Sequence, residues 1–348
     1  MRGALEAFFA RIWWAPQPGW QATLLRPLAA LYGMAWRRRQ ARSALPQRLP
    51  VPVLVVGNLI VGGAGKTPTV IAVVQALQAR GHRPGIVSRG HGRRGSEPCS
   101  VSARHGFADA GELGDEPLLL ARRTQVPVFV GRDRRATALA LLRSDPAVDV
   151  IVADDGLQHL ALHRDAELVV FDERGVGNGL LLPAGPLREP LPTRVSPMRH
   201  ILYTASVAST PLPGALAQRA LSLAWPLAAW HAGDSRAAQA LATLRGQPLL
   251  AAAGLAAPEK FFGMLRQAGL QIEALPLPDH FDFATLPWSA QGPDVLVTEK
   301  DAVKLDPSRT AARRVWVLPL DLVLPEALLD QLHRQLFGDV PNPTPRTP

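Results

Sequence analysis

The sequence has one cysteine, Cys99, among its 348 residues, and this scarcity excludes several classes of protein. A single thiol cannot form an internal disulfide or supply a thiolate metal cluster, so the chain is typical of a reducing compartment. Lysine is also scarce, since four lysines leave 34 arginines among the 38 basic residues. Because arginine is used throughout the chain, a lone arginine says little about function.

Long hydrophobic runs are missing as well. The uncharged run between Arg26 and Arg37 has ten residues, which is too short to cross a bilayer as a helix. Glu6 and Arg11 interrupt the apolar core that a secretory signal would need. The sequence therefore predicts neither a transmembrane helix nor a cleaved leader.

The positive charge is concentrated at one end of the chain. The net charge is +9, and residues 1–48 contain eight arginines against one acidic residue, which gives +7 and leaves +2 for the other 300 residues. A nearly neutral body does not offer the broad basic surface that nucleic acid requires, so no nucleic-acid partner is expected.

The same 48 residues contain four of the eight tryptophans, in short apolar stretches that end at Arg37-Arg38-Arg39. This composition predicts one or two short amphipathic helices that lie in a membrane interface, with rings at headgroup depth and arginines on anionic lipid. The alternative is a helical hairpin that packs on the rest of the protein and exposes a basic flank.

A glycine-rich stretch follows the first predicted strand. Residues 51–56 form a β-branched run typical of a buried strand, Gly57–Thr67 is rich in glycine, and an apolar helix pattern continues to Arg80. Strand, glycine-rich loop, Lys-Thr and helix together are the context of a phosphate-binding loop, in which backbone N–H groups surround phosphate oxygens. Lys66 then reaches the β- and γ-phosphates, and the Thr67 hydroxyl binds Mg²⁺. Ile60 stands where the general pattern has glycine, so a glycine-rich turn without a ligand stays an alternative.

Strands and helices alternate over the rest of the first half, which predicts a parallel sheet that binds ligands at the carboxyl ends of its strands. The strands are expected at 84–88, 126–130, 149–153 and 167–171, and the helices near 116–124 and 132–144. Asp154-Asp155-Gly156 follows the third of these strands directly. Carboxylates at that point suit the magnesium side of a P-loop enzyme, although Asp-Asp-Gly alone is also a common turn.

Five motifs in order resemble those of the tetraacyldisaccharide 4'-kinase family of lipid A synthesis. They are Gly57–Pro68, Gly114–Pro117, Asp154–His159, Pro183–Glu189 and Thr298–Lys304. The third motif has Leu157 where the family usually has phenylalanine, and Ile60 is normal for the family. The resemblance implies an enzyme that uses ATP and Mg²⁺ to phosphorylate the 4'-hydroxyl of a tetraacylated glucosamine disaccharide 1-phosphate. It also implies a peripheral or monotopic location at the cytoplasmic face of the bacterial inner membrane, with no obligate protein partner.

The resemblance also implies roles for individual residues. Nucleotide binding falls to Gly62, Gly63, Ala64, Gly65, Lys66 and Thr67, and metal binding to Thr67, Asp154, Asp155 and Glu116. Asp115 is expected as the base, His280 as a partner that raises its basicity, and Arg188 as a phosphate contact beside Lys66. Each has a plain alternative, because Asp115 could cap a helix, His280 could be a surface or capping residue, and Arg188 could be a solvated loop residue.

The predicted architecture is α/β, with a P-loop parallel-sheet domain, a second, smaller α/β domain and an N-terminal helical segment. The boundaries are 1–48 for the helical segment, 49–210 for the nucleotide domain, 211–338 for the smaller domain and 339–348 for a disordered tail. In the second domain, strands are expected at 249–254, 271–275, 295–298 and 315–318, and helices near 258–268 and 325–336.

Two other functions fit part of the pattern. A P-loop GTPase or transport ATPase would share the sheet, but the guanine-reading Asn-Lys-x-Asp motif is absent, because Thr298–Asp301 has its lysine one place late. A membrane-docking protein without enzymatic activity would show no lipid-dependent consumption of ATP. Lys300 and Lys304 have no role that the sequence indicates.

Overall fold

The computed structural model describes residues 2–42, 46–90, 97–102, 110–310 and 312–338, so the predicted tail at 339–348 lies outside the described residues. Contacts divide the chain into two compact units. The first contains Met1–Val87, Arg134–Gln218 and Leu324–Pro348, and the second contains Ser88–Asp133 and Arg219–Val323. Each unit is thus discontinuous in sequence, whereas the predicted domains are continuous stretches. The assignment of residues 49–210 to a nucleotide domain and of 211–338 to a smaller domain stays a prediction.

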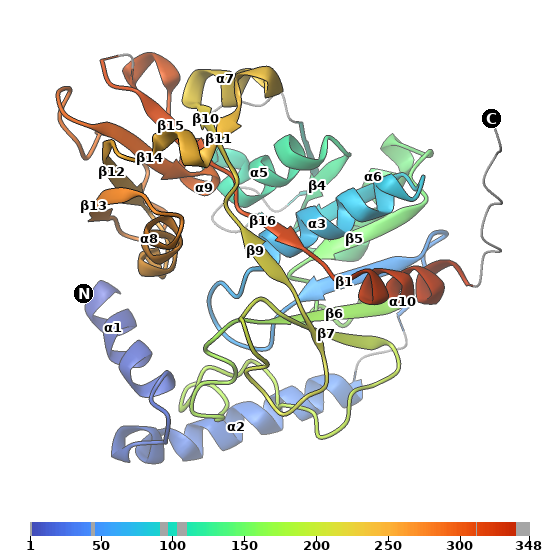
Figure 1. Cartoon of the computed structure of the whole chain (residues 1–348). Helices are drawn as coiled ribbons and strands as arrows, with labels where there is room; N and C mark the ends of the chain where they lie inside the picture. Colours follow the sequence, from blue (N-terminus) through green and yellow to red (C-terminus); the bar gives the residue numbers. More distant parts are fainter. Residues whose placement is uncertain (1, 43–45, 91–96, 103–109, 311, 339–348) are drawn as a thin grey trace. The chain divides into compact units, whose positions relative to one another are not determined.

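The first unit is built on a parallel sheet whose neighbouring strands follow the order β2-β5-β1-β6-β7-β8 (Figure 1). Its strands are β1 (Val53–Gly57), β2 (Pro84–Ser88), β5 (Val150–Asp154), β6 (Ala166–Phe171), β7 (Arg199–Tyr203) and β8 (Ala215–Leu216). All five pairings are parallel, and β1, β2, β5 and β6 are buried along their whole length. Continuous β-branched runs are typical of strands that are covered on both faces, so the predicted parallel sheet is confirmed.

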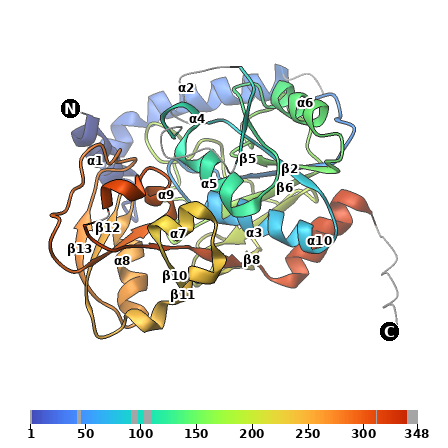
Figure 2. The same cartoon turned by 90° about the horizontal axis from the view of Figure 1, so that it is seen from above.

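Helices cover both faces of this sheet. In Figure 1, α3 (Lys66–Ala79) and α6 (Arg134–Ser144) lie above the central strands β1 and β6, and α2 (Trp20–Arg42) lies below them. The helix α10 (Glu326–Phe337) contacts both α3 and β6. Figure 2 shows α3 and α10 side by side from above, and the two helices are in contact. Leu328, Leu332 and Leu336 form the buried face of α10, at the i, i+4, i+8 spacing of a helix that packs on a core.

The N-terminal segment consists of α1 (Arg2–Trp13) and α2, and α2 is longer than the short helices predicted. It continues through Pro27, which removes one helical hydrogen bond. Packing compensates for this loss, because Ala22 and Ala29 are buried and the Tyr32 hydroxyl donates to the Arg188 carbonyl at 2.7 Å. Among the described residues, no helix is both long enough and apolar enough to cross a membrane.

The end of α1 is hydrogen-bonded to the loop after β6 through two backbone carbonyls and one side chain. The Asn178 backbone N–H donates to the Trp13 carbonyl at 2.9 Å, and its side-chain amide donates to the Ile12 carbonyl at 3.1 Å. The Trp13 indole donates to the Pro183 carbonyl at 2.9 Å. The N-terminal segment is therefore packed on the first unit through α1 and one face of α2, as the helical-hairpin alternative supposed.

The second unit contains a sheet in the order β11-β10-β15-β14-β12-β13. Four neighbouring strands, β15, β14, β12 and the edge strand β13, are parallel to one another. The strand β10 is antiparallel to both of its neighbours, β15 and β11. The bounds are β10 (Leu223–Pro226), β11 (Gln239–Ala240), β12 (Pro248–Ala253), β13 (Gln271–Pro276), β14 (Asp294–Thr298) and β15 (Val315–Leu318). The core of this unit includes Leu249, Phe261, Phe262, Leu265, Leu296 and Trp316. The four strands predicted here are present within one or two residues.

Shorter elements complete the chain. The helices are α4 (Ala110–Leu113), α5 (Asp115–Thr124), α7 (Leu227–Ala232), α8 (Pro258–Gln267) and α9 (Glu299–Ala302), with 3₁₀ turns at Ser235–Ala237, Leu241–Leu244 and Pro307–Thr310. The strands β3 (Cys99–Val101) and β4 (Val128–Val130) pair antiparallel, and β9 (Gln218–Ala220) pairs with β16 (Asp321–Val323). The sequence did not predict β3, β8, β9, β11 or β16, because two or three residues carry no periodicity, and it also missed the longer strands β7 and β10.

Gly177 provides a test of how the N-terminal segment docks. Its φ is +57°, and a Cβ atom added there would lie 2.3 Å from the Trp13 carbonyl oxygen. Gly179 is a matched control, since its φ is +74° and nothing lies within 4 Å of an added Cβ. We expect Gly179→Ala to lower the free energy of unfolding by about 1–2 kcal/mol through backbone strain alone. Gly177→Ala should lower it by about 1–3 kcal/mol more, because the Trp13 backbone must also move. Equal losses in urea unfolding would contradict this docking.

Candidate active site

The glycine-rich loop joins β1 to α3 in the first unit. Gly62 and Gly65 have φ values of +89° and +87°, a left-handed conformation that glycine adopts without strain. Asn58 is fully buried and spans the loop, because its amide donates to the Gly62 carbonyl at 3.0 Å and its carbonyl accepts from the Lys66 ammonium at 3.2 Å. Nothing in the sequence pattern indicated this role for Asn58.

Ile60 differs from the general P-loop pattern for a structural reason. Its side chain is fully buried, and its backbone forms an isolated antiparallel bridge with Leu187. The Pro186 carbonyl accepts from Val61 N–H at 2.9 Å, and Arg188 N–H donates to the Leu59 carbonyl at 2.7 Å. The first half of the loop is therefore a short strand-like segment held against residues 186–188, where an apolar side chain fits and glycine would leave a gap.

The predicted acidic pair lies beside this loop. Asp154 is the last residue of β5, and the parallel register places it opposite Val56 of β1, next to the start of the loop. The Asp155 carboxylate accepts from the Arg188 guanidinium at 3.1 and 3.2 Å, and the Lys66 ammonium lies 3.7 Å away. Burial alone would raise the pKa of Asp155, but the charges of Lys66 and Arg188 lower it. The structure thus brings together three residues that the sequence singled out separately.

The donor set at this edge fits a magnesium ion. Mg²⁺ prefers oxygen ligands and is usually held by one or two carboxylates together with substrate phosphates and water. Asp154, Asp155 and Thr67 supply carboxylate and hydroxyl oxygens at the ends of β5 and at the start of α3. Among the residues that the structure describes, no group of three or more His, Cys, Asp or Glu side chains could hold a metal by itself. Glu116, the fourth predicted ligand, belongs to the second unit.

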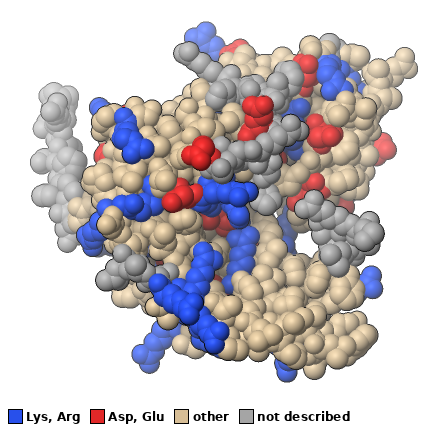
Figure 3. Space-filling model, turned by 180° about the vertical axis from the view of Figure 1, so that it is seen from behind, with Lys and Arg blue, Asp and Glu red and all other residues tan. Residues whose placement is uncertain are grey.

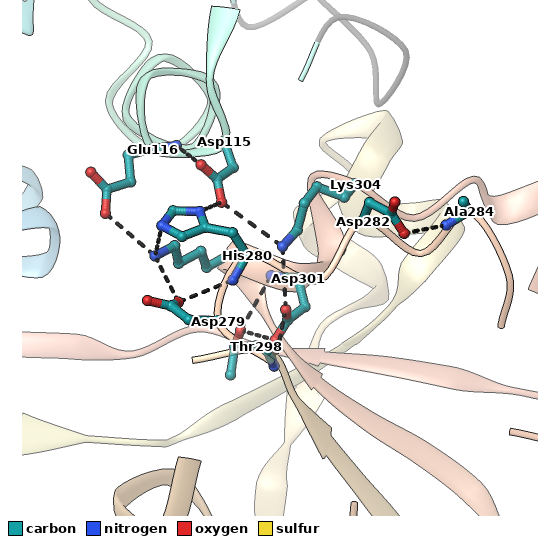
Figure 4. Close-up of polar contacts among 11 residues, drawn as sticks. Asp115, Glu116, Asp279, His280, Asp282, Ala284, Thr298, Asp301 and Lys304 are labelled. Carbon is teal, nitrogen blue, oxygen red and sulfur yellow. Dashed lines mark hydrogen bonds and ion pairs between the residues drawn. The ribbon is translucent and has the colours of Figure 1, made fainter. Parts of the chain in front are cut away.

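A second polar cluster lies wholly in the second unit (Figure 4). Asp115 is the first residue of α5, and its Oδ2 lies 3.0 Å from His280 Nδ1 and 3.8 Å from Lys304 Nζ. Its Oδ1 accepts from Glu116 N–H at 3.2 Å. Gly114, with φ +92°, occupies the N-cap position, so the alternative that Asp115 caps the helix is wrong.

The two lysines without a predicted role surround this pair. Lys300 Nζ lies 3.4 Å from His280 Nε2 and 3.5 Å from a Glu116 carboxylate oxygen. A lysine ammonium has only donors, so this contact makes His280 Nε2 an acceptor and leaves its proton on Nδ1, facing Asp115. Lys304 is 9% exposed and lies 3.6 Å from Asp301, which is fully buried.

The electrostatics of the cluster correct one expectation. Burial alone would raise the pKa of Asp115, but the hydrogen bond from His280 and the charges of Lys300 and Lys304 lower it to about 2. The same hydrogen bond raises the pKa of His280, against the opposing effects of burial and Lys300. The expectation that His280 makes Asp115 a stronger base is therefore wrong, because a donor stabilises the carboxylate anion. His280 instead keeps Asp115 ionised and oriented.

Comparison with known proteins places these features in one family. A sequence model of the family described as tetraacyldisaccharide-1-P 4'-kinase, LpxK, matches residues 21–337. The chain belongs to this family. It is similar to the tetraacyldisaccharide 4'-kinases of Methylibium petroleiphilum, 54% identical over 329 residues with 92% and 90% of the two chains covered, and of Leptothrix cholodnii, 52% identical over 341 residues with 95% and 97% covered.

A solved structure agrees with the assignment to the tetraacyldisaccharide 4'-kinase family. The "apo" form of LpxK from Aquifex aeolicus in complex with ATP superimposes with a TM-score of 0.74 at 27% identity. The match covers 91% of this chain and 100% of that one. The resemblance that the five motifs predicted is therefore confirmed, and so is the α/β fold with a P-loop sheet.

In this member of the tetraacyldisaccharide 4'-kinase family, a buried ion pair joins the two segments that carry the second cluster. Arg123 at the end of α5 donates to Glu299 of α9 at 2.5 Å and to Asp321 at 2.6 Å. The Trp230 indole donates to the other Glu299 oxygen at 3.1 Å. Asp115 lies on α5, and Lys300 and Asp301 lie on α9. The Arg123–Glu299 pair joins these two helices and so helps to hold the cluster residues together.

The importance of this pair can be measured against an exposed pair in the same unit. Arg123 and Glu299 are 12% and 6% exposed, whereas Arg266 and Glu259 on α8 are 52% and 73% exposed and 3.9 Å apart. We expect Glu299→Ala to lower the free energy of unfolding by about 3–5 kcal/mol, because it removes one of the two carboxylates that pair with the buried Arg123 guanidinium and also the acceptor of the Trp230 indole. Glu259→Ala should change it by less than about 1 kcal/mol. Similar effects in denaturant unfolding would contradict a clamping role for Arg123–Glu299.

Proposed function

We propose that this protein transfers the γ-phosphate of ATP to the 4'-hydroxyl of a tetraacylated glucosamine disaccharide 1-phosphate, a step of lipid A synthesis. The observation that carries the proposal is the match to tetraacyldisaccharide 4'-kinases along nearly the whole chain. The arrangement of the phosphate-binding loop with Lys66, Asp155 and Arg188 supports the kinase chemistry.

On the nucleotide side, backbone N–H groups of the loop hold the phosphates, and Lys66 and Arg188 neutralise their charge. The residues proposed for this contact are Gly62, Gly63, Ala64, Gly65, Lys66, Thr67 and Arg188. Both cations face Asp155 in this structure. Phosphate oxygens are stronger partners for these cations, so their arrival would release the Asp155 carboxylate toward the metal. Mg²⁺, held by Thr67, Asp154 and Asp155, would supply charge neutralisation, and Glu116 stays a predicted fourth ligand.

On the acceptor side, we propose that Asp115 receives the proton of the attacking hydroxyl. A carboxylate with a pKa of about 2 is a weak base, so its main contribution is to orient the hydroxyl through a hydrogen bond. Phosphoryl transfer has a loose transition state with little bond formation to the nucleophile, and the proton can leave late. Orientation by a fixed anion is what such a reaction needs. His280 and Lys304 supply that fixation through their contacts with Asp115 Oδ2.

The direct test is transfer of γ-labelled phosphate from ATP to the disaccharide lipid, with the product position determined by NMR. Asp115→Ala should lower turnover by about a hundredfold or more while ATP binding is retained. If the two residues act as a unit, adding His280→Ala to Asp115→Ala should cause little further loss. Asp282→Ala is the control, since Asp282 is an exposed residue of the same loop that bonds only to Ala284 among the contacts drawn in Figure 4.

Three results would count against parts of this proposal. Transfer to another position would contradict the 4'-hydroxyl as the acceptor. Nucleotide hydrolysis without transfer to the lipid, with GTP preferred over ATP, would favour the P-loop GTPase alternative. Fully multiplicative losses in the Asp115 and His280 variants would show that the two residues act independently.

We further propose that the outer face of α2 lies on the cytoplasmic face of the inner membrane. Trp20, Leu24, Leu28, Leu31 and Met34 on this helix are 40–71% exposed. The helix ends in exposed arginines, and Leu31, Met34 and Ala35 line a hollow of about 560 Å³ together with Arg38, Arg39 and Arg42. Seen from behind, the lower part of the protein, where α2 lies in Figure 1, shows a broad surface with few charges beside a group of basic side chains (Figure 3). Apolar side chains next to arginines suit the boundary between acyl chains and anionic headgroups.

Point variants test this proposal better than deletion, because removal of the segment would also remove buried residues such as Ile12 and Ala22. We expect a Trp20→Ser/Leu24→Ser variant to bind anionic phosphatidylglycerol vesicles about tenfold more weakly or worse. Its melting temperature and ATP affinity should not change, since both side chains are exposed. Val323→Ser, which removes an exposed apolar side chain (58%) from the second unit, is the control. Unchanged vesicle binding in the double variant would exclude this face as the membrane contact.

A further inference from the structure

One arginine contacts both the phosphate-binding loop and the N-terminal segment. Arg174 follows β6, and its guanidinium Nη2 donates to the carbonyl oxygen of Gly63. The same guanidinium lies over the Trp14 ring, with Cζ 4.4 Å from the ring centroid. All of these residues belong to the first unit.

The guanidinium is held in place from behind by Asp172. Arg174 Nε donates to the Asp172 carboxylate at 2.9 and 3.1 Å, and the Arg174 backbone N–H donates to the same side chain at 3.0 Å. Asp172 is 1% exposed, so its carboxylate is a fixed anchor inside the protein. A guanidinium has several N–H donors in one plane, so it can donate to the Asp172 carboxylate and to the Gly63 carbonyl at the same time. A lysine ammonium is a compact point charge without this planar arrangement of donors.

The contact with Gly63 controls the direction of a backbone donor. Glycines at positions 62, 63 and 65 give the loop wide conformational freedom, and Gly63 has no atom within 4 Å of where a Cβ would be. In a planar trans peptide, the C=O of one residue and the N–H of the next point in opposite directions. When Arg174 holds the Gly63 carbonyl outward, the Ala64 N–H must point to the other side of the loop. A phosphate-binding loop requires its N–H groups to converge in this way.

The Trp14 ring completes the arrangement. Its neighbour Trp13 is held by hydrogen bonds to Asn178 and Pro183. The docked end of α1 therefore positions the Trp14 ring against Arg174. Stacking on an aromatic face restricts a guanidinium to one plane, and the ring attracts the cation electrostatically. The position of the N-terminal segment is thereby transmitted to the loop through a single side chain.

We infer that Arg174 is a positioning residue for the phosphate-binding loop. We also infer that, through Trp14, the affinity for the nucleotide depends on how the N-terminal segment is docked on the first unit. This inference rests on the proposed function, since it takes the loop as the phosphate site. A segment that we place on the membrane thus also has a role in nucleotide binding. The simpler alternative is that Arg174 only neutralises the buried carboxylate of Asp172.

Arg174→Lys separates these two roles. Lysine keeps the positive charge beside Asp172, so the protein should fold. The lysine side chain lacks the planar N–H donors of the guanidinium and cannot stack on Trp14. We expect Arg174→Lys and Trp14→Leu each to raise the dissociation constant for ATP about threefold to tenfold in calorimetric titrations without lipid. In the double variant the effects should be less than multiplicative, because both act on one contact.

Three further proteins make the result decisive. Arg194→Ala removes an exposed arginine of the same unit and should leave ATP affinity unchanged. Trp20→Ser changes the exposed outer face of α2 and should weaken vesicle binding while ATP affinity stays unchanged. Lys66→Ala tests the nucleotide site itself, and melting temperatures report folding for every variant.

The outcomes distinguish a failure of the positioning role of Arg174 from a failure of the proposed nucleotide site. If Lys66→Ala weakens ATP binding while Arg174→Lys and Trp14→Leu do not, the positioning inference is overturned and the proposed function stands. If Lys66→Ala binds ATP as tightly as the wild type, the proposed nucleotide site is wrong. Multiplicative effects of the Arg174 and Trp14 changes would remove the link to the N-terminal segment, whereas sub-multiplicative effects support it.

Discussion

The parallel register between β1 and β5 determines where the nucleotide site can form. Val56 lies opposite Asp154, so the strand that leads into the phosphate-binding loop ends beside the strand that carries the acidic pair. Carboxyl ends of neighbouring parallel strands lie at the same edge of a sheet, and loops from both can reach one ligand there. A slip of one residue would turn the side chain of Asp154 to the other face of the sheet. Lys66, Asp155 and Arg188 can meet only because this register is fixed by buried strands.

The cluster around Asp115 is built on a different principle. Its residues come from α5, from the loop after β13, and from α9 with the turn that follows it, and His280 is 165 positions from Asp115 in the chain. No sheet register holds them together. Their positions depend on side-chain bonds, with Arg123–Glu299 joining the two helices from one side and Lys304 joining Asp115 to Asp301 from the other. Because these charged side chains are buried, loss of one partner would leave the other charge unpaired and would destabilise the fold.

The sequence predicted the regular core well because its strands are long β-branched runs. Such runs are buried on both faces, and their pattern does not depend on distant partners. Prediction failed for β3, β7–β11 and β16, of which all but the five-residue β7 have two to four residues and rely on neighbouring strands for their shape. It also failed for the length of α2, where tertiary contacts override the helix-breaking tendency of Pro27.

For the candidate site, motif resemblance supplied residue types but no contacts. Asn58 could not be recognised, because its importance lies in a bond across the loop to Lys66. The effect of His280 on the pKa of Asp115 was predicted with the wrong sign, since the sequence does not show that His280, Lys300 and Lys304 all lie close to this carboxylate. The roles of Lys300 and Lys304 emerged only from their distances to this pair.

The position of α10 has a consequence for how the protein is made. This helix comes from the last described stretch of the chain, yet it packs on α3 and β6 of the first unit. Arg80 at the end of α3 pairs with Glu326 and Asp330, and His82 contacts His333 at 2.9 Å. Domains that are continuous in sequence can fold one after another as they leave the ribosome. Here one layer of the nucleotide-binding unit follows the whole of the second unit in the chain, so the first unit can complete its core only after the second unit has been synthesised.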